Sequence, residues 1–183
     1  MNNEESAYPG DKGAKDVREE PDEQEAQVID TFKGNEAFQP RAWERLDRGE
    51  RLAALQGAED AIAGIQRRDP LPVRVQEGAR EGDYGGYNGH EILIGKDSIG
   101  NEPVNEVVNT LAHEGRHAYQ DYAMEHPDVH HDPKEVAAWR YNIYDTGYIE
   151  PEVDPVGYRN QPVEADAWAY GDRIEAGVYG GER

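Results

Sequence analysis

The stretch from Glu102 to His126 constrains the fold of this chain more than any other. Its apolar residues recur at steps of three and four, which is the period of a helix with one buried face. Pro103 suits the start of a helix, where a missing N–H group costs nothing. Pro127 disfavours the helical conformation in the residue before it, so the helix should end near His126. We therefore predict one long amphipathic helix over residues 102–126, packed against a hydrophobic core.

The polar face of this helix carries the sequence HEGRH at residues 113–117, an HExxH motif. Side chains at positions i and i+4 of a helix are neighbours, with Cβ atoms about 5–6 Å apart. The imidazoles of His113 and His117 can therefore bind the same Zn²⁺ ion, at distances of roughly 2.0–2.1 Å. Glu114 is rotated away by one residue, so it can flank the metal and accept a proton from a water molecule. The motif predicts one zinc ion per chain, with His113 and His117 as ligands.

The wider string HEGRHAYQDY, residues 113–122, resembles the active-site helix of zincin metallopeptidases, and of thermolysin-type gluzincins in particular. The shared pattern is HExxHAxxDY. By this resemblance His113 and His117 are zinc ligands, Glu114 is the general base and Asp121 orients a ligand. The resemblance implies zinc-dependent hydrolysis of peptide bonds in a protein or peptide substrate.

Two segments offer a third ligand because they share the pattern P-x-E-x-x-A-W-x-Y. They are residues 133–141, which contain Glu135, and residues 162–170, which contain Glu164. In each, a proline precedes a glutamate in what should be the first turn of a helix. Either carboxylate could complete a His₂Glu site and leave the fourth zinc position to water.

We favour Glu164 as the third ligand. Residues 161–167 resemble the P-x-E-x-x-A segment that supplies this ligand in several small bacterial zincins, including the repressor-cleaving type and the metallopeptidase domains of bacterial toxins. Glu135 remains an alternative because it follows His117 at a short interval, as the third ligand does in thermolysin-type enzymes. Asp166 is a further candidate.

One position departs from the thermolysin-type pattern. Those enzymes have an Asp four residues after the ligand Glu, where it orients a histidine, and this chain has Trp168 there. A histidine could be oriented instead by Asp166, Asp121, Asn109 or the backbone.

Four residues outside the central helix could also take part in catalysis. Tyr148 and Tyr158 lie in a segment rich in Pro, Gly and Tyr, and either hydroxyl could donate to a developing oxyanion, as Tyr or His does in many zincins. His130 and His131 lie in the loop after the helix. Neighbouring side chains diverge in an extended segment, so at most one of these histidines could face the metal. Packing or exposure to solvent is the alternative for all four.

The composition limits the partners of this chain. Its 183 residues carry 39 acidic and 19 basic side chains, for a net charge of −20. Nucleic acids and anionic membranes would be repelled, whereas a basic protein partner or a cationic substrate is compatible with this charge. The chain has no cysteine, so a zinc site must use His and carboxylate ligands.

Two regions are expected along the chain. Residues 1–27 are acidic and almost without apolar side chains, which is typical of a disordered leader, and residues 28–183 should form one domain. No signal-peptide or membrane-spanning pattern is present, so we expect synthesis in the cytoplasm, with export by a signal-independent route still open. The resemblance to toxin domains implies a toxin or effector role and a cognate inhibitor or immunity protein.

The remaining segments predict a zincin-like α+β fold with a small, mostly antiparallel sheet. We expect a scaffold helix over residues 41–68 with a break near Gly49, strands at 73–76 and 90–95, and two C-terminal helices. Residues 90–95 or the preceding hairpin could bind substrate by strand addition, or serve only as sheet core. The alternative function is a catalytically inactive zinc-binding module whose acidic surface binds a basic partner.

Overall fold

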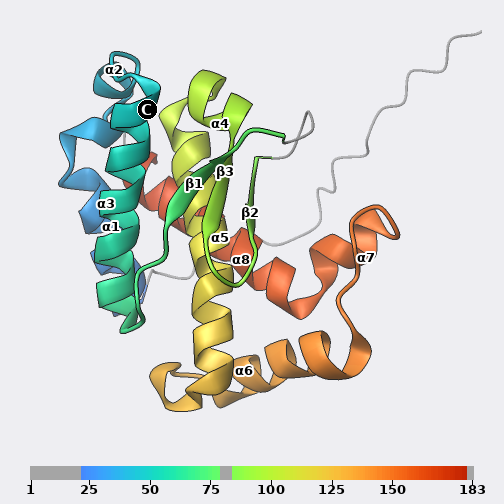
Figure 1. Ribbon diagram of the computed structural model, residues 1–183. Coiled ribbons are helices and arrows are strands. Elements are labelled where there is room, and N and C mark those ends of the chain that lie inside the picture. The colour runs from blue at the N-terminus through green and yellow to red at the C-terminus, as the bar shows by residue number, and fades with distance from the viewer. Residues whose placement is uncertain (1–21, 79–83, 181–183) are drawn as a thin grey trace, which may run out of the picture.

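Helix α5 (Val104–Glu125) runs through the centre of the molecule, and elements from both ends of the chain pack against it (Figure 1). The computed structural model describes residues 22–78 and 84–180. Within these residues the fold is α+β, as predicted: helices surround a small sheet of three strands.

The first half of the described chain contains α1 (Glu23–Lys33), the 3₁₀ turn η1 (Glu36–Phe38), α2 (Pro40–Trp43), α3 (Arg48–Gln66), β1 (Val73–Gln76), β2 (Gly85–Tyr87), β3 (Ile92–Gly95) and α4 (Lys96–Asn101). After α5 follow the 3₁₀ turn η2 (Pro127–Val129), α6 (Pro133–Arg140), the π-helical turn η3 (Tyr141–Thr146), α7 (Pro155–Asn160) and α8 (Pro162–Tyr179).

The predicted central helix is confirmed. Pro103 occupies the N-cap position with an extended backbone, just ahead of the first turn. At the other end the N–H of His126 still donates to the carbonyl of Tyr122 at 2.9 Å, and Pro127 then begins η2. None of the helices in residues 22–78 and 84–180 has both the length and the apolar character that a bilayer-spanning segment requires.

The sheet has the strand order β1-β3-β2 and is mixed. Strand β3 runs parallel to β1 and antiparallel to β2, so the prediction of a mostly antiparallel sheet is wrong in its detail. Because β3 lies in the middle, with Ile92 and Ile94 fully buried, it cannot accept a further strand. The strand-addition role predicted for residues 90–95 is therefore excluded for β3, and β2 is the strand with a free edge next to α5.

The scaffold helix is interrupted, as expected, but the break lies ahead of Gly49. Helix α2 ends at Trp43, and α3 begins at Arg48. A capping box fixes this second start: the Asp47 side chain accepts from the N–H of Glu50, and the Glu50 carboxylate accepts from the N–H of Asp47.

Residues 23–27, which the sequence assigns to the acidic leader, are the first turns of α1. Asp22 caps this helix, and Glu25 forms an ion pair with Arg173 of α8 at 2.6 Å. Residues 22–27, which precede Val28, therefore belong to the folded structure. The rest of the predicted leader, residues 1–21, lies outside the described residues.

Helix α8 crosses α5 and packs along it (Figure 1). The two backbones come close at Gly171, where an added Cβ atom would lie 2.7 Å from Oδ1 of Asn109. Only a residue without a side chain allows this approach. Helix α8 contributes three fully buried side chains to the core: Ala167, Tyr170 and Ile174. This crossing brings the start of α8 alongside the HExxH motif.

Candidate metal centre

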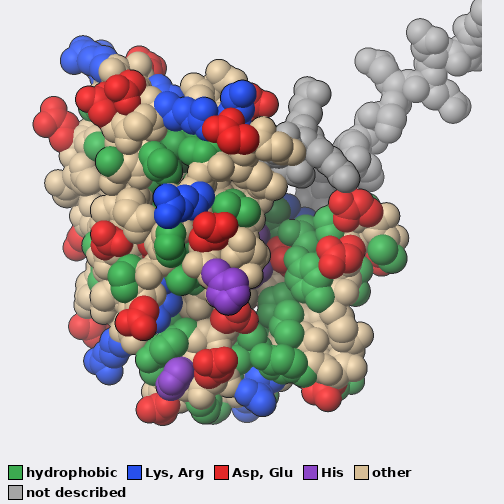
Figure 2. All heavy atoms as spheres, viewed as in Figure 1, with side chains coloured by type: hydrophobic (Ala, Val, Ile, Leu, Met, Phe, Trp, Pro, Cys, Tyr) green, Lys and Arg blue, Asp and Glu red, His purple; other side chains and the backbone are tan. Residues whose placement is uncertain are grey.

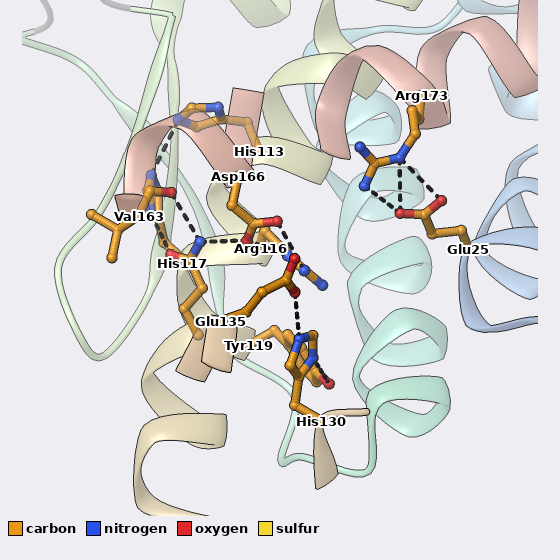
Figure 3. Close-up of polar contacts among 11 residues, drawn as sticks. Glu25, His113, Arg116, His117, Tyr119, His130, Glu135, Val163, Asp166 and Arg173 are labelled. Carbon is orange, nitrogen blue, oxygen red and sulfur yellow. Dashed lines mark hydrogen bonds and ion pairs between the residues drawn. The ribbon is translucent and has the colours of Figure 1, made fainter. Parts of the chain in front are cut away.

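His113, His117 and Glu164 converge at the crossing of α5 and α8. The Nε2 atoms of the two histidines are 3.1 Å apart (Figure 3). Oε1 of Glu164 lies 3.3 Å from Nε2 of His117, and Oε2 lies 3.5 Å from Nε2 of His113. One turn of helix α5 thus supplies two donors, and the first turn of α8 supplies the third.

These distances fit a tetrahedral zinc site. Ligand atoms bound at roughly 2.0–2.1 Å around a tetrahedral ion lie about 3.3–3.4 Å from one another. The Glu164 side chain is 1% exposed, and its Oε2 atom has no hydrogen-bond partner among the described residues. A buried carboxylate oxygen without a partner is costly, and a metal ion at this position would satisfy it. The donor set of two imidazoles and one carboxylate therefore fits zinc.

The electrostatics of the site favour a positive charge between the three donors. Burial by itself raises the pKa of Glu164, but the contacts with His113, His117 and Tyr148 outweigh it and hold that pKa far below its usual range. Burial likewise lowers the pKa of His117, yet Glu164 and Glu114 reverse this effect and leave it above its usual value. An ionised carboxylate thus faces both imidazoles.

Glu114 lies next to the three converging side chains but is not one of the candidate ligands. Its side chain is more than nine-tenths buried, and no hydrogen bond from another described residue reaches its carboxylate. Burial raises the pKa of the Glu114 carboxyl, the neighbouring Glu164 carboxylate raises it further, and the two histidines offset part of the rise. A carboxyl group with a raised pKa is suited to proton transfer near neutral pH.

Strand β2 covers Glu114 from one side. A Cβ atom added at Gly85 would lie 3.2 Å from Cγ of Glu114 and 2.6 Å from Cγ2 of Thr110. The glycine therefore lets the strand backbone lie directly against the motif.

The residues that orient the histidines differ from those expected. Nδ1 of His117 contacts Oε1 of Gln120 at 3.0 Å, and Nε2 of Gln120 donates to Asp166 at 2.7 Å. Asp166, one of the predicted orienting groups, thus acts through a glutamine that the sequence did not single out. The sequence position of this glutamine could have indicated its role, because a residue three positions after His117 lies on the same face of the helix.

The other predicted orienting groups bind elsewhere. Asp121 accepts a hydrogen bond from the Tyr87 hydroxyl at 2.9 Å. The side-chain amide of Asn109 donates to Asp172 at 3.1 Å and to Glu175 at 2.8 Å. Trp168, which stands where thermolysin-type enzymes have an Asp, packs its ring against His113 with 4.5 Å between ring centroids. Apart from its contact with Glu164, His113 is therefore held by packing and not by a second carboxylate.

The alternative third ligands lie in other interactions. Glu135 contacts Nε2 of His130 at 2.7 Å, so it belongs to the group of His130 and His131 and not to the HExxH site (Figure 3). Asp166 is bound by the guanidinium group of Arg116 at 2.8 and 3.0 Å.

No protein-family model matches this chain, and neither a curated protein nor a solved structure is similar to it.

Two cavities flank the three converging side chains. One, of about 550 Å³, is lined by His117, Glu164 and the end of β2, and the other, of about 480 Å³, is lined by His113, Glu114 and the start of β2. Tyr148 lines the first cavity and Tyr158 the second. Both tyrosines that the sequence suggested as oxyanion donors thus border the centre.

Proposed function

We propose that this chain is a zinc-dependent metallopeptidase with a zincin-like site. The observation that carries the proposal is the convergence of His113, His117 and Glu164 around an unsatisfied carboxylate oxygen, beside a buried Glu114 that binds no other described residue. A purely structural zinc site has no need of such a glutamate, whereas hydrolysis requires a general base within reach of the metal.

Zn²⁺ bound by the three ligands would polarise a substrate carbonyl and lower the pKa of a coordinated water molecule. Glu114 is positioned to accept the proton of the attacking water and to pass it to the leaving amine. Burial raises the pKa of Tyr148 and of Tyr158, so both hydroxyls keep their protons. Tyr158 could donate directly to the oxyanion that forms on the substrate, whereas Tyr148 donates to Glu164 here and would have to turn from that carboxylate to do so.

An extended peptide is the substrate that the surroundings favour. Tyr84 and Asn88 form backbone hydrogen bonds with the residues around β3. Because residues of an antiparallel strand alternate, Gly86 also faces β3, and Gly85 and Tyr87 turn their N–H and C=O groups away from it. These groups pair with no strand of the described residues, and Gly85 and Tyr87 each line one of the two cavities, so a peptide could add to β2 as a further strand.

The charge of the second cavity favours a basic side chain in the substrate. Its lining includes one cation, Arg159, whose guanidinium group lies over the ring of Trp168. The acidic side chains outnumber it: Glu106, Asp172 and Glu175 also line the cavity, and none of these three pairs with a Lys or Arg within residues 22–78 and 84–180. Burial and the neighbouring carboxylates raise the pKa of Glu106, which reflects their mutual repulsion. The surface in Figure 2 also carries many acidic side chains around the hollow between the sheet and α7.

The alternative function, a catalytically inactive zinc-binding module, predicts the same three ligands but no role for Glu114. A toxin or effector role, with an inhibitor or immunity protein as partner, remains a prediction from the resemblance of the motifs.

Metal content and peptide hydrolysis should be measured on the wild type and on Glu114→Gln. The proposal predicts one zinc ion per chain in both proteins and a fall in turnover of at least about 100-fold in the variant. Wild-type protein that binds zinc without hydrolysing any of a diverse set of peptides would favour the inactive module. Wild-type protein that binds no zinc would refute both.

A further inference from the structure

Arg116 is a buried cation within the HExxH motif, and its contacts fix the charge state of its partner. The guanidinium group lies 4.9 Å from the ring centroid of Tyr119 and 4.8 Å from that of Tyr170, and it forms two hydrogen bonds with Asp166. A guanidinium group can only donate, so both carboxylate oxygens of Asp166 act as acceptors.

Gln120 must therefore turn its NH₂ group towards Asp166. Its Nε2 atom donates to Oδ2 of Asp166 at 2.7 Å and to the carbonyl of Val163 at 2.9 Å, so both amide hydrogens are used on groups that only accept. Gln120 is only 2% exposed, so water could not replace these hydrogen bonds if the amide were turned round with its oxygen towards Asp166. The carbonyl oxygen Oε1 is consequently the atom that faces His117.

The same pairing of donors with acceptors determines which ring nitrogen of His117 carries the proton. Because Oε1 of Gln120 only accepts, the His117 nitrogen 3.0 Å away, Nδ1, must carry hydrogen. Glu164 also only accepts, and its Oε1 lies 3.3 Å from Nε2, so both ring nitrogens carry hydrogen while the imidazole is charged. When the imidazole loses one proton, the shorter contact with Gln120 keeps hydrogen on Nδ1 and leaves the lone pair on Nε2, the atom that faces His113 and Glu164. We infer that Arg116, Asp166 and Gln120 form a relay that presets His117 as a metal ligand, with Gln120 and Asp166 as positioning residues. Figure 3 labels Arg116, Asp166 and His117 of this set.

The relay also joins the two helices that supply the ligands. Val163 and Asp166, which receive the hydrogen bonds of Gln120, flank Glu164 on α8. The same amide thus orients one ligand on α5 and holds the segment that carries another. His113 has no comparable support, since its buried Nδ1 atom lacks a hydrogen-bond partner among the residues that the structure describes.

This inference rests on the metal centre of the proposed function but not on peptidase activity. It is tested first on metal-free wild-type protein, by measuring the ¹⁵N chemical shifts of the His117 ring at alkaline pH, where the imidazole is neutral. The relay predicts hydrogen on Nδ1, whereas free histidine favours hydrogen on Nε2. Hydrogen on Nε2 of His117 would overturn the inference whether or not the protein binds zinc or cleaves peptides.

The second test is zinc affinity, measured by competition with a chelator. Gln120→Met keeps the size of the side chain but removes the relay, and we expect zinc to bind about 10–100-fold more weakly. Asp166→Asn, which removes one acceptor two steps from the metal, should act in the same direction. An affinity within about twofold of wild type in a folded Gln120→Met protein would contradict the relay.

Gln56→Met is the matched control. The Gln56 amide also joins a helix to another segment, since it accepts from the N–H of Val73 at 2.8 Å and donates to the carbonyl of Leu71 at 3.0 Å. Its loss should lower the melting temperature of the protein without changing zinc affinity. Equal losses of affinity in both glutamine variants would show that only packing is involved and would overturn the inference.

Discussion

The Tyr148 hydroxyl donates a hydrogen bond of 2.5 Å to Oε1 of Glu164, the same oxygen that lies 3.3 Å from Nε2 of His117. Tyr148 comes from the segment between η3 and α7, and its neighbour Ile149 is held by two backbone hydrogen bonds to the Gln161 side chain, of 2.9 and 3.0 Å. A tyrosine from an irregular segment is thereby fixed next to the candidate zinc ligands.

Tyr148→Phe tests whether this hydroxyl acts on the substrate. Loss of a donor to an oxyanion typically lowers kcat by about 10²–10³-fold, and we expect a fall of this order in kcat. The assay is run with zinc in excess, because the hydroxyl is also bonded to the candidate ligand Glu164. Tyr144→Phe serves as the control, because Tyr144 is 64% exposed and contacts neither cavity lining. A Tyr148→Phe enzyme with wild-type kcat would exclude the oxyanion role.

Gly85→Ala should disturb the strand that covers Glu114. The new methyl group would lie 2.6 Å from Cγ2 of Thr110 and 2.9 Å from the carbonyl oxygen of Leu93, so the strand must shift. We expect the free energy of unfolding to fall by about 1–3 kcal/mol, and peptide cleavage to weaken, because of this overpacking. Denaturant unfolding and activity assays measure both effects.

Gly86→Ala is the matched control for that change. No atom lies within 4 Å of a Cβ added at Gly86, so we expect its free energy of unfolding to stay within about 0.5 kcal/mol of wild type. Equal effects at the two glycines would mean that β2 does not depend on close contact with α5.

The choice between the two predicted third ligands can be tested by metal content. Glu164→Gln removes a buried carboxylate that faces both histidines. Groups that only orient a metal ligand contribute about 10–100-fold to metal affinity, so loss of a ligand itself should lower zinc affinity by more than about 100-fold. Glu135→Gln removes a half-exposed carboxylate that pairs with His130, and zinc content should not change. Loss of zinc in the Glu135 variant alone would reverse our assignment.

The acidic lining of the second cavity should appear in substrate preference. Asp172→Asn combined with Glu175→Gln removes two negative charges, and we expect kcat/KM to fall more for peptides with Lys or Arg than for neutral ones. The preference of the wild type should also weaken with added salt, because salt screens charges near the surface. An unchanged preference would remove the electrostatic argument for a basic substrate.

A charge-matched control separates this local effect from the net charge of the protein. Asp30→Asn combined with Glu44→Gln also removes two charges. Asp30 is exposed on α1, Glu44 is exposed in the turn after α2, and neither residue lines a cavity. The control should leave substrate preference as it is in the wild type.

Local patterns in the sequence predicted much of this molecule. The period of apolar residues located helix α5 to within two residues at each end, and the HExxH spacing put two imidazoles on one face of it. The alternation at Val73–Gln76 located β1, and the prolines at 133 and 162 marked the starts of α6 and α8. These features depend on neighbours within one or two turns, so the sequence carries them without knowledge of the fold.

Only the tertiary structure decided how distant segments meet. Glu135 and Glu164 share one sequence pattern, and what separates them is that α8 crosses α5 closely at Gly171 while α6 packs against the far end of that helix. The parallel pairing of β1 with β3 and the role of Gln120 likewise depend on contacts between residues far apart in the chain. Such contacts arise from the packing of whole elements and from the pairing of buried donors with acceptors, and no local period records them.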